Sequence, residues 1–386
     1  MTRRYDADAV TRALVIVDLT DPERGPHALQ ILASLIAEAA SSLWKETAVS
    51  IRRAPPIVDV ADNYDRLGYA PDAVARDARY SRYVDERRML RSHTSAMIPA
   101  LLRELAAAHA RTDDAVDVAW ACPGIVYRRD CIDRLHSGEP HQLDLWRIRR
   151  DGRYGELGPA DLESMIVAVT RALLPGSEIR MEPRIHPYTQ HGLQVDVRAG
   201  DEWIEILECG VAHPEVLRVA GLDPKEWSGL AMGMGLDRLL MLKKQVPDIR
   251  LLRAIDVRIA SQMDDLRPYV PVSSMPPIRR DLSVVVADGD AAEEIGDRVR
   301  GALGHDAGVV EEVSIQSETS HDELPEAARR RLGIRRGQKN LLVRVVLRDP
   351  SRTLTHDEAN GLRDRIYAAI HQGTEHEWAQ ARGRGP

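Results

Sequence analysis

Hydrophobic positions recur along the chain at two spacings, and each spacing predicts a different kind of element. Apolar side chains at helical spacing predict helices at residues 28–43, 97–108 and 160–174. Alternation of apolar and polar side chains predicts strands at residues 117–121, 125–128, 141–147, 193–198 and 203–207. Ala199-Gly200 joins the last two strands as a hairpin turn. Alternating strands linked by hairpins favour an antiparallel sheet over βαβ units.

A stretch rich in proline and serine divides the chain. Residues 267–277, RPYVPVSSMPP, hold four prolines and two serines, so we place a linker at 267–276 and the domain boundary near residue 275. The pattern then restarts, with strands at 281–286, 309–316 and 341–347 and helices at 291–303 and 356–371. This order, with room for a last strand, predicts a ferredoxin-like βαββαβ domain at residues 277–373, followed by a tail at 374–386.

Composition narrows the class of protein. A chain of 386 residues with 44% hydrophobic and 29% charged residues is long enough for two or three globular domains, and it is neither fibrous nor wholly disordered. The net charge of −7 excludes a protein that is basic overall, although it permits a local basic patch. Three cysteines without a CxxC pair argue against a disulfide framework and favour a reducing compartment, the cytoplasm. Neither a secretory signal nor an apolar run long enough to cross a membrane is apparent, so no membrane partner is expected.

Polar side chains gather around one predicted hairpin. Arg128 and Asp130 are two residues apart, so we expect them to share one face of the first strand. Gln142 and Asp144 are expected to share one face of the second strand in the same way. Because the loop between the strands adds Asp133, His136 and His141, a functional site is favoured here over a merely solvated face.

A glycine-rich stretch precedes another predicted helix. Gly229, Gly233 and Gly235 allow close approach of the backbone, and Arg238 falls in the first turn of the helix that follows. Spacing alone favours packing of a strand against a helix here, and it does not support a Rossmann fold.

These stretches resemble the motifs of the phenylalanyl-tRNA synthetase family, within the class II aminoacyl-tRNA synthetases. VYRRDCIDRLHSGEPHQLDLW resembles motif 2, and GLAMGMGLDRLLML resembles motif 3. DNYDRLGYAPD, LRSHTSA and HPYTQHGLQVDVRAGDEWIEILECGVAHPEVL resemble stretches around the family's active site. The segment from PPIRRDLSVVV to DPSRTLTHDEANGLRDRI resembles the ferredoxin-fold anticodon-binding domain.

The resemblance covers roughly residues 58–373, with the motifs in the family's order. It implies an α+β fold, in which a class II antiparallel sheet flanked by helices occupies residues 58–266. Residues 1–57 lie outside the resemblance and are expected to form an N-terminal extension, and the ferredoxin-like domain is expected to follow the core. Joined in this way, the chain is similar to the single-chain, mitochondrial-type enzyme.

The implied activity is ATP-dependent ligation of phenylalanine to tRNA through an aminoacyl-adenylate, with Mg²⁺ as cofactor. Arg128 matches the arginine that holds the α-phosphate, and Arg238 matches the one that holds the γ-phosphate. Glu205 matches the carboxylate associated with Mg²⁺. Asp130 stands where the family contacts the adenine amino group, and His136 is assigned to the same ATP site.

The resemblance also implies an amino-acid site. Gln142 and Asp144 match the pair that binds the ammonium group, with Asp144 in place of the usual glutamate. The remaining residues assigned to this site are His93, Ser95, His186, Tyr188, Ala231 and Gly233.

Departures from the family pattern leave the substrate open. The family's Phe-Pro-Phe is His186-Pro187-Tyr188 here, a glutamine is replaced by Ile98, and the whole chain contains 0 Phe. Buried polar groups without partners would reject phenylalanine, whereas phenylalanine stays favoured if those groups bond elsewhere in the protein. One alternative is a divergent paralogue that activates another aromatic amino acid, for a non-tRNA acceptor or as a backup or resistance enzyme. A second alternative is a non-catalytic RNA-binding module.

Basic residues cluster in the C-terminal domain. Arg335, Arg336 and Lys339 are the predicted tRNA contacts, within a set that also contains Arg329, Arg330, Arg331, Arg344, Arg348 and Arg352. The sequence leaves monomer and homodimer both open.

Overall fold

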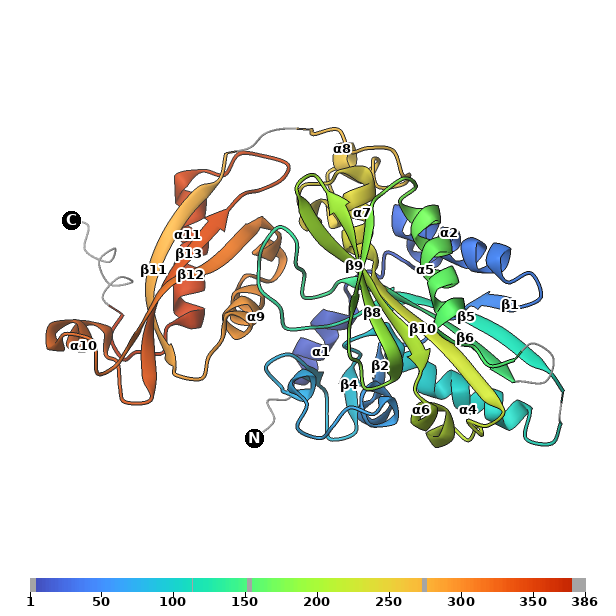
Figure 1. Ribbon diagram of the computed structural model, residues 1–386. Coiled ribbons are helices and arrows are strands. Elements are labelled where there is room, and N and C mark those ends of the chain that lie inside the picture. Colours follow the sequence, from blue (N-terminus) through green and yellow to red (C-terminus); the bar gives the residue numbers. More distant parts are fainter. Residues whose placement is uncertain (1–4, 113, 151–154, 273–275, 377–386) are drawn as a thin grey trace. The chain divides into compact units, whose positions relative to one another are not determined.

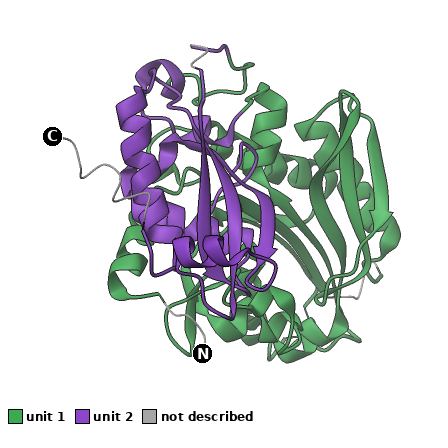
Figure 2. Cartoon of the chain, turned by 90° about the vertical axis from the view of Figure 1, so that its left-hand side faces the viewer, with its two compact units in different colours: residues 1–128, 139–247, 261–269 green, residues 129–138, 248–260, 270–386 purple. Residues whose placement is uncertain are grey.

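The computed structural model describes residues 5–112, 114–150, 155–272 and 276–376. The chain divides into two compact units (Figure 2). Unit 1 comprises residues 1–128, 139–247 and 261–269, and unit 2 comprises residues 129–138, 248–260 and 270–386. The predicted linker falls at the last passage between the units, and three of its residues, 273–275, lie outside the described residues.

A seven-stranded sheet organises unit 1 (Figure 1), in the order β1-β5-β6-β10-β9-β8-β7. Its strands are β1 (Ala48–Ile51), β5 (Val116–Ile125), β6 (His141–Arg150), β7 (Ile179–Pro183), β8 (Thr189–Ala199), β9 (Glu202–Ala212) and β10 (Trp227–Gly235). Every neighbouring pair is antiparallel except β1 and β5, which are parallel. The predicted antiparallel sheet is therefore confirmed apart from this edge pair. A smaller sheet of the same unit joins β2 (Ile57–Asp59), β4 (Arg88–Leu90) and β3 (Arg82–Tyr83).

The strand predicted at residues 125–128 is wrong. β5 ends at Ile125, after which Val126 N–H donates to the carbonyl of Pro140 and Tyr127 N–H donates to that of Arg91. The Val126 bond continues the register of β5 with β6, but the Tyr127 bond takes the backbone to Arg91, just after β4, so Arg128 and Asp130 do not share a strand face. Gln142 and Asp144 do lie on one face of β6, as predicted.

Helices cover both faces of the large sheet. The helices of unit 1 are α1 (Ala7–Leu14), α2 (Ala28–Leu43), α3 (Val60–Asn63), α4 (Ile98–Ala108), α5 (Pro159–Leu173), α6 (Pro214–Val219) and α7 (Leu236–Lys244). The three predicted helices are confirmed as α2, α4 and α5. α2 and α5 lie side by side on one face, while α4 and α6 pack with Trp120, Trp146 and Ile148 in an apolar cluster on the other. Within the described part of the chain, no helix is long and apolar enough to cross a membrane.

Unit 2 is built on a three-stranded antiparallel sheet in the order β11-β13-β12. Its elements are α8 (Val257–Ala260), β11 (Ile278–Ala287), α9 (Ala292–Leu303), β12 (Val310–Ser320), α10 (Glu326–Leu332), β13 (Gln338–Leu347) and α11 (His356–Ile370). α9 and α11 pack against each other and close an apolar core with the sheet. The predicted βαββα order is confirmed, with α10 as an unexpected insertion. The described residues of this unit contain no closing strand after α11, and residues 377–386 lie outside them.

Segment 129–138 belongs to unit 2 although it follows β5 in the chain. Ile132 is part of the unit's apolar core, and its carbonyl accepts a hydrogen bond of 2.9 Å from Val313 N–H. The Arg300 guanidinium donates to the carbonyls of Asp130 (2.8 Å) and Cys131 (2.7 Å). The segment thus rests on α9 and β12.

Two glycines of α9 offer a matched test of this arrangement. A Cβ at Gly296 would lie 2.9 Å from the Asp130 carbonyl oxygen, so we expect G296A to cost about 1–3 kcal/mol of unfolding free energy by displacing the segment. A Cβ at Gly301 meets no atom within 4 Å, so G301A should stabilise the helix by up to about 1 kcal/mol. Urea unfolding of both variants measures the difference. Equal effects would show that the segment does not rest on α9.

Candidate active site

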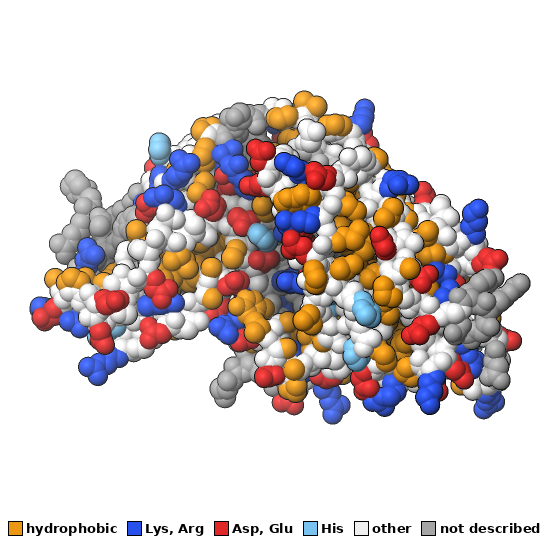
Figure 3. All heavy atoms as spheres, in the orientation of Figure 1, with side chains coloured by type: hydrophobic (Ala, Val, Ile, Leu, Met, Phe, Trp, Pro, Cys, Tyr) orange, Lys and Arg blue, Asp and Glu red, His pale blue; other side chains and the backbone are white. Residues whose placement is uncertain are grey.

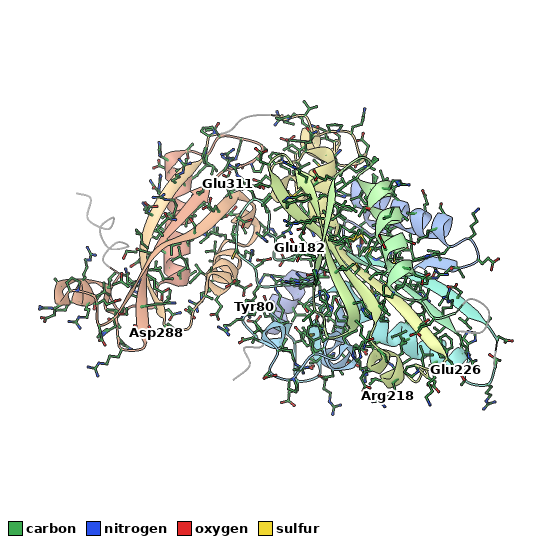
Figure 4. The ribbon with its side chains drawn as sticks, viewed as in Figure 1. Tyr80, Glu182, Arg218, Glu226, Asp288 and Glu311 are labelled. Carbon is green, nitrogen blue, oxygen red and sulfur yellow. The ribbon has the colours of Figure 1, made fainter. Side chains whose placement is uncertain are left out.

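One row of side chains crosses the centre of the large sheet. Asp144 on β6 lies opposite Gly233 on β10, and Gly233 lies opposite Glu208 on β9. Because glycine has no side chain, the two carboxylates face the same open space from either side. The row continues through Gln194 to Glu182 at the edge strand β7 (Figure 4).

A β-bulge brings a second glutamate to this face. Val195 pairs with Leu207 and Asp196 pairs with Glu205, which leaves Ile206 as an extra residue. The bulge reverses the alternation, so Glu205 and Glu208 point to the same side although they are three residues apart. Burial, and after it the charge of Glu208, raises the pKa of Glu205, while Arg238 acts in the opposite direction. Glu205, Glu208 and Arg238 are therefore electrostatic neighbours.

Asp144 is a buried carboxylate surrounded by donors. Its Oδ1 accepts from Thr94 Oγ1 at 2.7 Å, its Oδ2 accepts from Trp146 Nε1 at 3.1 Å, and Ser95 adds a third bond. Burial raises its pKa, and these hydrogen bonds offset only part of the rise. A cationic group brought beside Asp144 would favour its charged form.

Gln142 presents a buried acceptor on the same face of β6. It lies between Gly124 on β5 and Gly235 on β10. Among the described residues, its Oε1 is buried and has no hydrogen-bond partner. A buried acceptor of this kind calls for a donor from a ligand or from water. Gln142 and Asp144 together form an acceptor pair on one face of β6.

His93 and Tyr69 form one wall of the same region. Their rings stack with centroids 5.8 Å apart, and the side chain of Arg128 is held nearby by a bond from its Nε to the Ser92 carbonyl, 2.7 Å. Burial, followed by the charge of Arg128, lowers the pKa of His93 to about 3, so the imidazole is neutral at physiological pH. Burial raises the pKa of the Tyr69 phenol, and Asp144 and Glu208 act on it too, which places this phenol near both carboxylates.

Tyr188 and Ala231, two of the residues predicted to bind the amino acid, lie beyond Asp144 on either side of Trp146. Tyr188 stacks on Trp146 with centroids 6.1 Å apart, and Trp146 lies opposite Ala231. The Tyr188 hydroxyl bonds with Ser95, and burial raises its pKa. This part of the site is an aromatic and apolar surface whose polar tip already has a partner.

His186 is bound to Glu208 in the row of side chains that crosses the large sheet. Its Nε2 lies 2.8 Å from Glu208 Oε2, and Arg184 Nε donates to Glu208 Oε1 at 2.8 Å. Burial alone would raise the pKa of Glu208, but His186 and Arg184 outweigh it and the pKa lies below its ordinary value. Glu208 is therefore an ionised carboxylate with both oxygens in use.

Sequence reasoning missed several residues of the site. They are Tyr69, Thr94, Trp146, Arg184 and Glu208. Trp146 could have been found from its spacing to Asp144, two residues away on the same strand, and Thr94 from its place between the predicted residues His93 and Ser95. Glu208 could not, because strand alternation places it on the face opposite to Glu205 unless the bulge is known.

The predicted site residues are divided between the two units. Gln142, Asp144, His93, Ser95, His186, Tyr188, Ala231, Gly233, Glu205, Arg128 and Arg238 all belong to unit 1. Asp130 and His136 belong to unit 2, where Asp130 Oδ1 accepts from Cys131 N–H at 2.8 Å and His136 Nδ1 lies 2.7 Å from Asp133 Oδ2. Arg335, Arg336 and Lys339 also belong to unit 2.

The basic cluster of unit 2 is largely paired with acids. Arg335 and Arg336 are exposed, and Lys339 lies 3.1 Å from Glu318. Arg348 pairs with Glu311 on β12, and further ion pairs join Arg330 to Glu326, Arg344 to Asp281 and Arg352 to Glu358. Blue and red side chains are accordingly interspersed over this unit on the face shown in Figure 3.

A separate cavity of about 510 Å³ lies elsewhere in unit 1. Asp18, Arg53, Arg91 and Tyr127 contribute to its lining. None of the residues predicted to bind the amino acid lines it. The cavity is therefore distinct from the row of side chains that crosses the large sheet. Over the residues that the structure describes, no group of three or more His, Cys, Asp or Glu side chains is arranged to hold a metal ion.

Comparison with protein families agrees with this architecture. Residues 17–263 match the model described as tRNA synthetases class II core domain (F), and residues 273–378 match the ferredoxin-fold anticodon binding domain. Together these are the two domains of a class II tRNA synthetase.

Individual relatives narrow the class further. The chain is 28% identical to the chloroplastic/mitochondrial phenylalanine--tRNA ligase of Arabidopsis thaliana, over 89% of this chain and 76% of that protein. It is 31% identical to the phenylalanine--tRNA ligase alpha subunit of Bacillus subtilis (strain 168), over 62% of this chain and 68% of the subunit. For the alpha subunit of Chlorobium chlorochromatii (strain CaD3) the identity is 32%, over 64% and 74%. The chain belongs to the phenylalanine--tRNA ligase family.

The contributions of Glu205 and Glu208 on β9 to the stability of the fold should depend on pH in opposite directions. The lowered pKa of Glu208 stabilises the fold above the ordinary value of 4.5, and this contribution is lost as pH falls through the folded-state pKa. E208Q should therefore be less stable than the parent protein by about 1–2 kcal/mol at neutral pH, and the difference should shrink in acid. Because the pKa of Glu205 is raised, this residue costs the fold stability as the pH rises above 4.5. The free energy of unfolding of E205Q should therefore increase relative to that of the parent protein as the pH rises from 4.5 to about 7. Urea unfolding between about pH 3.5 and pH 7 measures both trends, and parallel trends would contradict the assignment.

Proposed function

We propose that the protein ligates phenylalanine to tRNA in two steps, with ATP as the energy source. In the first step, a carboxylate oxygen of the amino acid attacks the α-phosphorus, and the bond to pyrophosphate breaks. In the second step, a ribose hydroxyl of the tRNA attacks the acyl carbon, loses its proton, and AMP leaves. The observation that carries the proposal is the pair formed by Asp144 and the unpartnered Oε1 of Gln142 on one face of β6.

This pair suits an α-ammonium group. Gln142 offers an acceptor that no described residue uses, and Asp144 offers a buried carboxylate whose pKa is raised and whose charge a cation would restore. A neutral His93 beside Arg128 adds no positive charge that would repel the ammonium group. Amino-acid binding then leaves the carboxylate of the substrate free to react.

Two arginines are available for the phosphates. We assign Arg128 to the α-phosphate and Arg238 to the γ-phosphate, because planar guanidinium groups bind phosphate oxygens in pairs. Transfer at phosphorus depends mainly on positioning and on stabilising the developing negative charge. For Asp130 and His136, which belong to unit 2, contact with ATP stays a prediction from the sequence.

Glu205 fits a role in holding Mg²⁺. Burial and its neighbour Glu208 raise the pKa of Glu205. A bound cation would stabilise the charged form of this carboxylate. Magnesium commonly uses one or two protein carboxylates together with phosphate oxygens. Glu205 would hold the ion, and the ion would supply charge neutralisation at the phosphates.

The ring-binding surface favours phenylalanine over a hydroxylated ring. The polar groups that depart from the family pattern already bond within the protein, His186 with Glu208 and Tyr188 with Ser95. What faces the ring is then Trp146, Ala231 and the face of Tyr188, all of them suited to an apolar side chain. The alternatives, activation of another aromatic amino acid or RNA binding without catalysis, are outcomes of the tests below.

The tRNA is assigned to unit 2, where Arg335 and Arg336 are exposed. Lys339 is assigned to the same surface. The cytoplasmic location and the choice between monomer and homodimer stay predictions from the sequence.

Amino-acid-dependent exchange of pyrophosphate into ATP is the first test. We expect exchange with phenylalanine, and we expect R128K to lose at least about 100-fold of it because a point charge cannot replace the planar guanidinium. R52K is the matched control, since Arg52 pairs with Glu104 at 2.9 Å and has no assigned role. Absence of exchange with every aromatic amino acid would leave RNA binding as the function. Unchanged activity of R128K would contradict the role of this arginine.

Substrate ranking is the second test. Because His186 and Tyr188 already bond within the protein, phenylalanine should exceed tyrosine and meta-tyrosine by roughly 10- to 100-fold in kcat/KM. Y188F should keep the KM for phenylalanine within about threefold, since its hydroxyl bonds to Ser95 and not to the ring. Faster exchange with a hydroxylated amino acid would identify the protein as a divergent paralogue.

A further inference from the structure

A fully buried histidine contacts both the end of the strand that leads to Arg128 and the first turn of the helix that carries Arg238. His141, the first residue of β6, is 0% exposed. Its Nδ1 lies 2.8 Å from Asp237 Oδ1, and its backbone N–H donates to Asp237 Oδ2 at 2.5 Å. On its other side, the backbone N–H of Leu19 donates to Nε2 at 3.1 Å.

These contacts select one form of the imidazole. A backbone amide can only donate, so the nitrogen that accepts from Leu19 carries no proton. The ring proton is then on Nδ1, where it is donated to the Asp237 carboxylate. Asp18 Oδ1 is farther from Nε2, at 4.0 Å. The Leu19 amide therefore keeps the ring proton on Nδ1, where it can hold Asp237.

Asp237 precedes Arg238 in the first turn of α7. Both of its oxygens are used on His141, one by the main chain and one by the ring. The neighbouring rung of the sheet pairs Gly235 with Gln142. The contact thus extends the β6–β10 ladder by one step into the helix, and it fixes the turn that carries Arg238.

The same network reaches the strand that leads to Arg128. Ile125, the last residue of β5, pairs with His141, and its N–H donates to Asp18 Oδ2 at 3.1 Å. Thr20 donates twice to Asp18 Oδ1, through its amide at 2.9 Å and its hydroxyl at 2.7 Å. One buried cluster therefore connects residues 18–20, here called the N-terminal segment, with the end of β5 and the start of α7.

We propose that His141 is a positioning residue for Arg238, and that the N-terminal segment takes part by holding His141 in its Nδ1–H form through Leu19. Substrate does not contact His141 in this role; it acts through Asp237 on the arginine assigned to the γ-phosphate. The inference rests on the proposed function, because it concerns the site assigned to ATP.

Two isosteric substitutions separate the two sides of the imidazole. In H141N the side-chain amide nitrogen occupies the place of Nδ1 and can still donate to Asp237. In H141Q the side-chain oxygen reaches the place of Nε2 and can still accept from Leu19. We expect H141Q to raise the KM for ATP by about tenfold or more, as misplacement of a binding group does, with the KM for the amino acid changed less than about twofold. H141N should stay within about threefold of the parent protein for both.

His213 supplies a matched control. Its Nδ1 also accepts a backbone amide, that of Glu215, at 3.1 Å, but at the start of α6. H213Q should leave the KM for ATP unchanged. If His141 serves the fold alone, H141N and H141Q will lower the melting temperature while the kinetic constants per active site stay at parent values, and that result would overturn the proposal.

Two measurements distinguish failure of this inference from failure of the proposed function. A non-hydrolysable ATP analogue, titrated against the full-length parent protein, should bind, and H141Q should bind it about tenfold more weakly. No binding to the parent would refute the assigned ATP site itself, whereas equal binding by parent and variant would refute only the role of His141. In ¹⁵N spectra, the imidazole of His141 should show the Nδ1–H tautomer, and the Nε2–H tautomer would overturn the selection by Leu19.

Discussion

The antiparallel register of β6 against β10 is the constraint on which the site depends. It sets Asp144 opposite Gly233 and Trp146 opposite Ala231, so that a polar row and an apolar row lie next to each other on one face. A slip of one residue would turn Asp144 into the opposite layer and bring Leu143 or Leu145 to the substrate side. Both strands are almost completely buried, and this burial is what makes the register specific. The places proposed for an ammonium group and for an aromatic ring are thus neighbours on a single strand pair.

Much of this arrangement could be read from the sequence, because it depends on local periodicity. The helix at residues 28–43 appears with the predicted bounds, and the alternation at 141–147 correctly puts Gln142 and Asp144 together. What the sequence could not give arises from long-range contacts. The bulge at Ile206 depends on pairing between β8 and β9, and β5 ends early because Tyr127 bonds to Arg91, far away in the chain. Arg128 was therefore identified by its motif, while its predicted strand was wrong.

The absence of phenylalanine changes what the interior must satisfy. Tyrosine and tryptophan take its place in the core, and each brings a polar tip that needs a partner when buried. Tyr64 meets this need by donating to the carbonyl of Ala75, and Tyr83 does so with that of Arg76. Trp146 donates to Asp144 itself, so an aromatic core residue helps to orient the carboxylate assigned to the substrate. Core packing and substrate recognition are linked here through one indole N–H.

Segment 129–138 has a consequence for how the chain can be recombined. It lies within the sequence of the catalytic core, yet Ile132 is buried among side chains of unit 2 and Arg300 binds the carbonyls of Asp130 and Cys131. A chimera made by joining the core of this protein to the C-terminal domain of a relative near residue 275 would keep the segment and replace its surroundings. The apolar side chain of Ile132 and the two carbonyls would then face a surface that did not evolve with them. Exchange of the C-terminal domain between relatives is therefore an exchange of two pieces of sequence, of which the smaller is an internal stretch of the core.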